Sequence, residues 1–130
     1  GHPDVVYVCQ RIKRFRNLKN KKFKIQGTGN EIRSFIYIDD FVSAFNLILK
    51  KGKHLNVYNI GTNEKIKIKH LVSKLSKLFE RKIILKKVPS RKGSTIIRIP
   101  NISKIKKLGF KQKYRLTQGL QKILLIKNYK

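Results

Sequence analysis

Apolar residues recur along this chain with two spacings, and their alternation predicts an α/β fold. Steps of three and four residues are typical of amphipathic helices, whereas short apolar runs bounded by turn residues indicate strands. The helical spacing predicts helices over residues 5–18, 39–49, 69–79, 103–108 and 116–126, and the short runs predict strands over 23–25, 32–38, 57–60 and 83–88. Helices and strands that alternate in this way favour an α/β class over an all-α or all-β one. Because several strands have no sequence neighbour to pair with, we expect them to need a sheet contributed by another part of a longer chain.

Length and composition limit the possibilities further. A chain of 130 residues that is 40% apolar suits a single domain with one core, so we expect residues 1–130 to form one unit. No apolar run approaches the ~20 residues of a membrane-spanning helix, and the opening residues do not resemble a secretory signal. The single Cys9 cannot form an internal disulfide, which favours a reducing, cytoplasmic setting. The absence of any methionine, including at the start, suits a fragment.

The charge is unusually positive. Lys and Arg together number 33 against 6 Asp and Glu, a net charge of +27. A basic nucleic-acid-binding module is one interpretation, because clustered cations release counterions from a phosphate backbone. However, 25 of the cations are Lys, they occur throughout the chain, and the aromatic residues have the spacing of core residues. We therefore expect only non-specific attraction to nucleic acids and keep the module as the alternative.

Motifs for common catalytic and cofactor sites are missing. Gly27-Thr28-Gly29 has Ile32 where a dinucleotide-binding loop needs its third Gly, and a strand follows it where that loop needs a helix. No Tyr-x-x-x-Lys pair occurs, since Tyr7 has Arg11 at that spacing. The histidines, which are His2, His54 and His70, lack a metal-ligand spacing. The sequence therefore indicates no catalytic residue, no cofactor loop and no metal site.

Arginine is the residue type that remains informative. Lys is the ordinary cation of this chain, so the 8 Arg residues mark positions that favour a planar guanidinium group. Such a group can bind a phosphate through two parallel hydrogen bonds. Arg33 follows the Gly turn, Arg91 lies in a Pro-x-Arg-x-Gly loop, and Arg98 precedes Pro100. Loops and strand starts often supply ligand contacts, so these three are the candidate site. The adjacent Asp39 and Asp40 open a helix, and we expect them to cap it.

The order of these segments resembles a known family. Residues 27–40 resemble the stretch G-x-G-x-x-x-R-S/D-F-x-Y-V/I-D-D of the extended short-chain dehydrogenase/reductase family, which comprises NAD-dependent nucleotide-sugar epimerases, dehydratases and decarboxylases. Residues 57–61 match the next strand and turn of that family, and residues 89–93 resemble its P-x-R-x-G loop. Residues 98–110 are similar to its R-x-P-D-I-S-K-x-x-x-L-G-W/F ending, with Asn101 in place of the usual Asp at a helix cap.

The resemblance implies roles for particular residues. Arg33 and Arg91 match the arginines that contact the nucleotide diphosphate, and Arg98 matches a further phosphate-side arginine of some members. Lys24, Ile25 and Gln26 match the segment of the family whose backbone borders the nucleotide base. The NAD-binding loop and the Tyr-x-x-x-Lys pair of the family precede the region that matches this chain.

The resemblance thus implies the C-terminal, substrate-binding portion of an extended short-chain dehydrogenase/reductase, with a mixed small sheet, helices and no N-terminal Rossmann portion. NAD is expected to be held by the missing portion. The expected partners of the chain are that portion and the nucleotide-sugar substrate, and the full enzyme is expected to form a homodimer. The parent activity is expected to be that of a UDP-glucose 4-epimerase or a related dehydratase or decarboxylase. The isolated chain is expected to be inactive, and a poorly folded chain is a further alternative.

Overall fold

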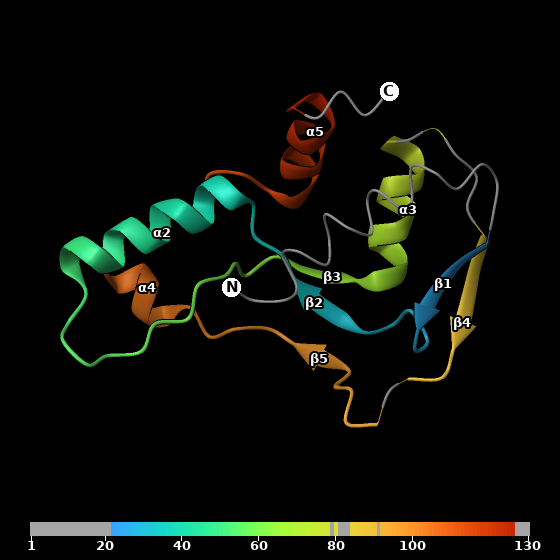
Figure 1. Ribbon diagram of the computed structural model, residues 1–130, viewed down its shortest axis with the longest axis horizontal. Helices are drawn as coiled ribbons and strands as arrows, with labels where there is room; N and C mark the ends of the chain where they lie inside the picture. Colours follow the sequence, from blue (N-terminus) through green and yellow to red (C-terminus); the bar gives the residue numbers. More distant parts are fainter. Residues whose placement is uncertain (1–21, 79, 81–83, 91, 127–130) are drawn as a thin grey trace.

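The computed structural model describes residues 22–78, 80, 84–90 and 92–126 (Figure 1). The strands are β1 (Lys22–Gln26), β2 (Ile32–Ser34), β3 (Lys65–Lys67), β4 (Ile84–Val88) and β5 (Ile97–Arg98), and the helices are α2 (Ile38–Lys51), α3 (Ile68–Leu78), α4 (Ser103–Lys107) and α5 (Leu116–Ile126). The predicted α/β class is confirmed. The helix predicted over residues 5–18 lies outside the described residues. Within them, no helix combines the length and apolar character needed to cross a bilayer.

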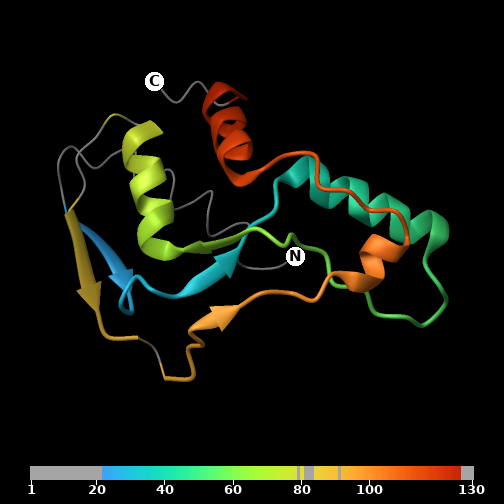
Figure 2. The same cartoon turned by 180° about the vertical axis from the view of Figure 1, so that it is seen from behind.

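The strands form two small sheets. β2 is the central strand of a three-stranded mixed sheet, antiparallel to β3 and parallel to β5, and β1 pairs in parallel with β4. Figures 1 and 2 show the three-stranded sheet in the middle of the molecule, with β1 and β4 at one end and α2 and α4 at the other. The turn between β1 and β2 therefore lies where the two sheets meet.

Two apolar clusters hold the elements together. The first joins β1, β3, α3 and α5 through Ile25, Ile66, Leu71, Val72, Leu75 and Leu120. The second joins α2 to α4 and its flanking residues through Ala44, Ile102, Ile105 and Phe110. Each helix turns an apolar stripe to its cluster, as the three- and four-residue spacing predicts.

Asp40 plays a different part from the predicted helix cap. Tyr37 is the N-cap of α2 and its side chain makes no capping hydrogen bond. The buried carboxylate of Asp40 instead accepts hydrogen bonds from the backbone N–H groups of Lys113 (3.1 Å) and Tyr114 (2.9 Å). The capping prediction is therefore wrong for Asp40, which fastens the segment before α5 to the start of α2. Asp39 stays exposed in the first turn, where it complements the helix dipole.

Strand boundaries account for most other differences from the predicted elements. The run over residues 32–38 forms a strand only as far as Ser34, because the Thr62 hydroxyl donates to the carbonyl of Phe35 (3.0 Å) and α2 begins at Ile38. Residues 57–60 pair with no strand among the described residues, so that predicted strand is absent there. The sequence pattern did not predict β3 or β5, which are three and two residues long.

Candidate functional site

Two of the three candidate arginines lie opposite each other in the mixed sheet. The register of β2 and β5 pairs Arg33 with Arg98. Paired residues of neighbouring strands direct their side chains to the same side of a sheet, so the two guanidinium groups share one side. Arg33 is half-buried and Arg98 is exposed. The fold thus joins two positions that are far apart in the sequence, and it does so through β5, which the sequence pattern did not predict.

Backbone carbonyl groups hold the guanidinium of Arg33 in place. Its Nη1 donates to the carbonyls of Ile32 (2.9 Å) and Ile96 (3.2 Å), and its Nη2 donates to the carbonyl of Thr95 (2.9 Å). Three of the five N–H donors are therefore occupied. The other two, one on Nε and one on Nη2, have no hydrogen-bond acceptor within the described part of the chain. Guanidinium donors of this kind can bind the oxygens of a phosphate or carboxylate.

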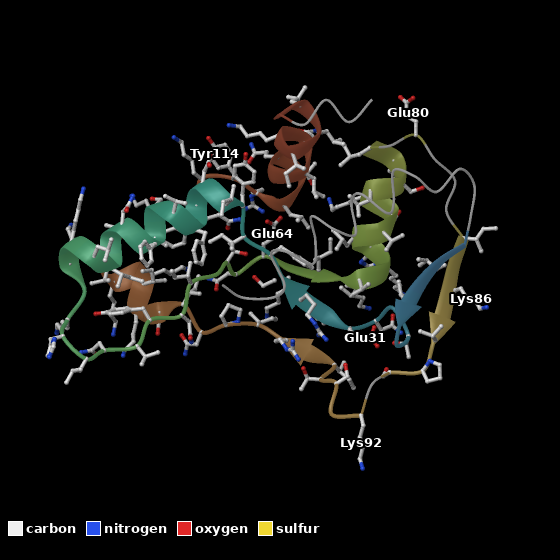
Figure 3. The ribbon with its side chains drawn as sticks, viewed as in Figure 1. Glu31, Glu64, Glu80, Lys86, Lys92 and Tyr114 are labelled. Carbon is white, nitrogen blue, oxygen red and sulfur yellow. The ribbon has the colours of Figure 1, made fainter. Side chains whose placement is uncertain are left out.

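The turn between β1 and β2 is closed by a buried carboxylate. Gly27 and Gly29 adopt positive φ angles of 96° and 87°, which residues with a side chain rarely adopt. The backbone N–H groups of Thr28 (2.9 Å) and Gly29 (2.8 Å) donate to the carboxylate of Glu31, which Figure 3 shows at this turn. The amides that a Gly-rich loop could offer to a phosphate are therefore already bonded to an acidic side chain.

These hydrogen bonds favour the ionised form of Glu31. The amide of Thr28 contributes most to lowering the pKa of the carboxyl below its ordinary value of 4.5. Burial opposes this effect, and the amide of Gly29 and the hydroxyl of Thr28 reinforce it. The turn therefore holds a negative charge at neutral pH, which would repel a phosphate.

A dependence of stability on pH follows from the pKa of Glu31. Because its folded pKa is below the unfolded value, its contribution is fully present above about pH 4.5 and is lost as the pH falls through the folded pKa. We expect Glu31→Gln to lower the free energy of unfolding at neutral pH and to bring the wild-type and variant values together in acid. Urea titrations from about pH 7 to about pH 3 measure this difference. A constant difference across that range would show that the charge of Glu31 is not the cause.

The other residues predicted for the site are Arg91, Lys24, Ile25 and Gln26, and the structure describes only the last three. Arg91 lies outside the described residues. The backbones of Lys24 and Gln26 pair with Lys86 and Val88 in the β1–β4 sheet. The side chain of Ile25 is 1% exposed and belongs to the first core cluster, so only its backbone could border a ligand.

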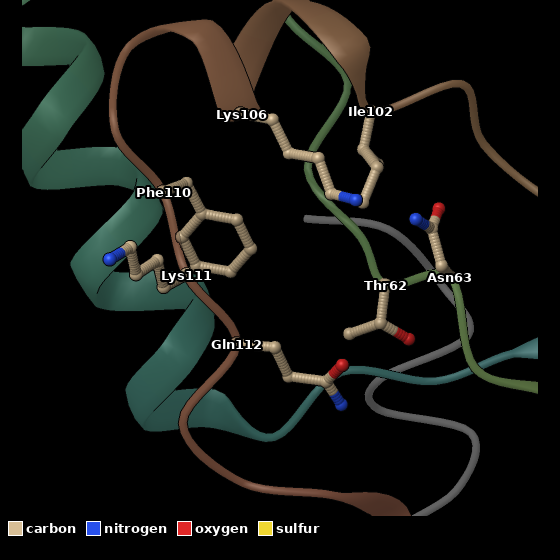
Figure 4. Close-up of a pocket in the computed structure, with 7 residues that line it drawn as sticks. All are labelled: Thr62, Asn63, Ile102, Lys106, Phe110, Lys111 and Gln112. Carbon is tan, nitrogen blue, oxygen red and sulfur yellow. The ribbon is translucent and has the colours of Figure 1, made fainter.

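A shallow hollow lies near α4, away from the arginines. Its volume is about 430 Å³, and its lining residues are Thr62, Asn63, Ile102, Lys106, Phe110, Lys111 and Gln112. In Figure 4 the ring of Phe110 faces the hollow, whereas Lys111 points away from it towards α2. Sequence reasoning missed this hollow although Ile102, Lys106 and Phe110 lie within the 98–110 motif, because the rest of its wall includes Thr62 and Asn63 from a distant part of the chain. Residues 22–78, 80, 84–90 and 92–126 contain no group of His, Cys, Asp or Glu suited to a metal ion.

The loop beside this hollow is fixed by acidic side chains. Glu64 accepts hydrogen bonds from the backbone N–H of Leu116 (2.8 Å) and the side-chain amide of Gln112 (3.3 Å). With the Asp40 bonds to Lys113 and Tyr114, these contacts hold the segment between α4 and α5. Figure 3 labels Glu64 and Tyr114 in this part of the molecule. These carboxylates therefore hold the segment between α4 and α5 in place.

Comparison with known proteins decides the family. Residues 5–123 match the family described as GDP-mannose 4,6 dehydratase. The chain belongs to this family. Its members and structural relatives are NAD-dependent dehydratases and epimerases of the extended short-chain dehydrogenase/reductase type, which confirms the resemblance. The dTDP-D-glucose 4,6-dehydratase of Dictyostelium discoideum is 56% identical over 57 residues, which make up 42% of this chain and 13% of that protein.

Solved structures confirm the fold of this family member. The dTDP-glucose 4,6-dehydratase of Bacillus anthracis, solved with NAD, superposes with a TM-score of 0.76 at 27% identity, covering 88% of this chain and 37% of that one. The UDP-glucuronic acid 4-epimerase of Bacillus cereus, solved with UDP-glucuronic acid and NAD, gives 0.73 at 28% identity, covering 82% and 35%. This family member thus spans about a third of the length of these solved relatives.

NAD is the cofactor in these two solved relatives, but the described residues of this chain do not fit it. The one Gly-rich turn among them binds the carboxylate of Glu31 through the amides of Thr28 and Gly29, where a pyrophosphate would need free N–H groups. The turn also leads into β2 and not into a helix, and the backbone N–H groups of Ile68 and Lys69 at the start of α3 already donate to the carbonyls of Glu31 and Gly29.

Proposed function

We propose that residues 1–130 form the nucleotide-sugar-binding region of an NAD-dependent 4,6-dehydratase or 4-epimerase. The observation that carries this proposal is the pairing of Arg33 with Arg98 on β2 and β5, with two N–H donors of Arg33 that no acceptor in the described part of the chain occupies. A nucleotide diphosphate supplies oxygens for such donors. The solved UDP-glucuronic acid 4-epimerase, with its bound UDP-sugar, supports this class of ligand.

Arg91 and the backbone of β1 complete the proposed site. The loop that contains Arg91 runs from Val88 at the end of β4 to Thr95, whose carbonyl holds Arg33. We therefore assign Arg91 as the second diphosphate ligand and Arg98 as an assisting one. The backbone at Lys24, Ile25 and Gln26 lies just before the Gly27 turn, and we assign it to the base side of the nucleotide.

The chemistry in this proposal takes place outside the chain. Neither a Tyr-x-x-x-Lys pair nor a dinucleotide-binding loop is present in the 130 residues, so we assign NAD and the catalytic residues to the rest of the enzyme. The chain alone would bind substrate without turning it over. Whether the parent reaction is an epimerisation or a dehydration depends on groups in that other part.

Substitution of Arg33 tests the proposed site. A charged hydrogen bond contributes about 1.5–3 kcal/mol, so Arg33→Ala should weaken binding of UDP, dTDP or GDP at least about tenfold. Arg33→Lys should weaken it as well, because an ammonium group cannot reproduce the planar set of donors of a guanidinium. Isothermal titration calorimetry on the 130-residue chain measures these affinities.

Arg115→Ala is the matched control, because Arg115 is exposed just before α5 and outside the proposed site. It removes the same charge and should leave nucleotide affinity unchanged. Equal affinities for wild type and Arg33→Ala would contradict the proposed site. Melting curves of all variants check that the fold is retained.

The salt response separates this proposal from a nucleic-acid-binding module. Exposed lysines occur on α2 (Lys50), β4 (Lys86) and α4 (Lys106), and this wide distribution favours non-specific attraction over a defined groove. Polyanion binding should fall steeply with salt and should change little in Arg33→Ala. Tight DNA binding that persists at about 0.2 M salt would favour the module instead.

The cellular setting and assembly belong to the same proposal. The single Cys9 and the family membership are consistent with a cytoplasmic enzyme. We assign the missing NAD-binding half as the partner of this chain, and homodimer formation to the complete enzyme.

A further inference from the structure

The turn between β1 and β2 already holds an anion, which is the carboxylate of Glu31 (Figure 3). The backbone N–H of Thr28 (2.9 Å) and its hydroxyl (3.3 Å) donate to one carboxylate oxygen, and the backbone N–H of Gly29 (2.8 Å) donates to the other. Within the described part of the chain, these donors and no cation meet the charge of Glu31. Successive backbone amides that converge on one oxyanion form an anion-binding turn.

The two glycines of the turn make room for this anion. A Cβ atom at Gly27 would collide with the carboxylate of Glu31, so the space that the carboxylate occupies exists only because Gly27 has no side chain. The positive φ angles of Gly27 and Gly29 bring the successive amides of Thr28 and Gly29 to the same group. The turn is therefore shaped for a group that presents two oxygens.

Helix α3 adds positive charge beside the turn. The backbone N–H of Ile68 donates to the carbonyl of Glu31 (3.0 Å), and that of Lys69 donates to the carbonyl of Gly29 (2.9 Å). The positive end of the α3 dipole thus lies next to the turn, and the first turn of α3 contains no acidic residue. Lys69 itself is exposed and could attract an external anion. This environment favours an anion in the turn, whether it comes from the chain or from solution.

The turn and the proposed diphosphate site border the same loop. The hydroxyl of Ser90 in the loop after β4 would lie 3.0 Å from a Cβ atom at Gly27. Further along that loop, the carbonyl of Thr95 accepts a hydrogen bond from Arg33 (2.9 Å). A phosphate group that approaches this loop therefore meets two sets of donors, the amides of the turn and the guanidinium of Arg33.

We propose that residues 27–29 are a phosphate-binding turn that Glu31 occupies from within the chain, so that Glu31 directs the nucleotide diphosphate to Arg33. A carboxylate and a phosphate both present paired oxygens to N–H donors, so the two groups compete for the same amides. Glu31 would thus be a specificity-determining residue. The inference rests on the proposed function only in assigning the diphosphate to Arg33; the exclusion of phosphate from the turn does not depend on that assignment.

Removal of the Glu31 side chain tests the proposal. Glu31→Ala leaves the amides of Thr28 and Gly29 without their acceptor, and inorganic phosphate at about pH 7 should take its place. In a nuclear magnetic resonance titration, phosphate should shift these two amide resonances in the variant with an affinity at least about tenfold higher than in the wild type. Formate, which replaces the missing carboxylate, should raise the melting temperature of the variant by about 3 °C or more and leave that of the wild type unchanged.

Glu64→Ala is the matched control. It removes the same charge and also removes the acceptor of a backbone N–H, that of Leu116 (2.8 Å), but it lies outside the glycine turn. Because the net charge of the two variants is equal, non-specific attraction of phosphate is equal as well. Phosphate should leave the amide resonances of Thr28 and Gly29 unchanged in this control. Glu31→Ser, which has a small polar side chain, provides the same test if Glu31→Ala does not fold.

A double variant separates this inference from the proposed site. Glu31→Ala combined with Arg33→Ala should bind inorganic phosphate at the turn as well as Glu31→Ala alone does. It should also bind UDP at least about tenfold more tightly than Arg33→Ala, because the freed turn accepts a phosphate. An unchanged UDP affinity in Arg33→Ala alone would contradict the proposed site and not the turn.

Three results would overturn the inference. The first is a Glu31→Ala chain in which phosphate does not move the amide resonances of Thr28 and Gly29. The second is a wild-type chain in which phosphate moves them with the same affinity, since Glu31 would then exclude nothing. The third is an equal response in Glu64→Ala, which would assign the binding to the overall charge of the chain.

Discussion

Replacing Asp40 by Ala is expected to lower the free energy of unfolding by about 3 kcal/mol. The Asp40 carboxylate is 2% exposed and receives the backbone N–H groups of Lys113 and Tyr114. Hydrogen bonds to a charged group contribute more than neutral ones, and the substitution leaves two amides without their acceptor. The segment that leads into α5 would then lose its connection to α2. Urea titration followed by circular dichroism measures the change.

Asp39→Ala provides the control for this prediction. Asp39 occupies the same first turn of α2 but is exposed. Its loss removes only a favourable interaction with the helix dipole, so we expect a decrease of less than about 1 kcal/mol. Equal effects of the two substitutions would mean that the Asp40 hydrogen bonds do not hold the loop.

Replacing Ile105 by Ala should destabilise the fold by about 3 kcal/mol, within the range measured for large-to-small changes in cores. Ile105 is fully buried at the centre of the cluster that joins α2 and α4. Its truncation removes apolar contacts and leaves a cavity, which the neighbouring Ala44 is too small to fill. The midpoint of urea unfolding should fall while its slope remains unchanged.

Ile96→Ala is the control, because Ile96 is 71% exposed and the substitution is chemically the same. Its effect should stay below about 0.5 kcal/mol. The carbonyl of Ile96 still accepts the hydrogen bond from Arg33 in this variant, so the candidate site is preserved. A similar loss from both substitutions would contradict the burial of Ile105.

The sequence predicted the helices better than the strands, for a local reason. Helix α2 repeats its apolar positions within a few residues, so the pattern that forms it lies inside the element. β5 is two residues long, and only its pairing with β2, more than 60 residues earlier in the chain, makes it a strand. Residues 57–60 show the converse, since a clear strand pattern forms no strand without a neighbour.

The arginines illustrate the same division for the candidate site. The motifs around Arg33 and Arg98, and the resemblance of those motifs to a family, are sufficient to select both residues as candidates. The sequence could not indicate that the carbonyls of Thr95 and Ile96 hold the guanidinium of Arg33. That orientation depends on how a distant loop folds against β2.

The sequence by itself therefore determined the α/β class, the positions of the helices that the structure describes, the family and the candidate arginines, because periodicity and motif order are local properties of the chain. Only the tertiary structure decided that Glu31 fills the Gly-rich turn, that Asp40 fastens a loop, and which side of α2 is covered. The Asp40 contacts and the packing of α2 depend on groups that meet across long sequence separations, which residue spacing alone does not encode. The Glu31 contacts are local, but they depend on the positive φ angles of Gly27 and Gly29, which the spacing does not give either.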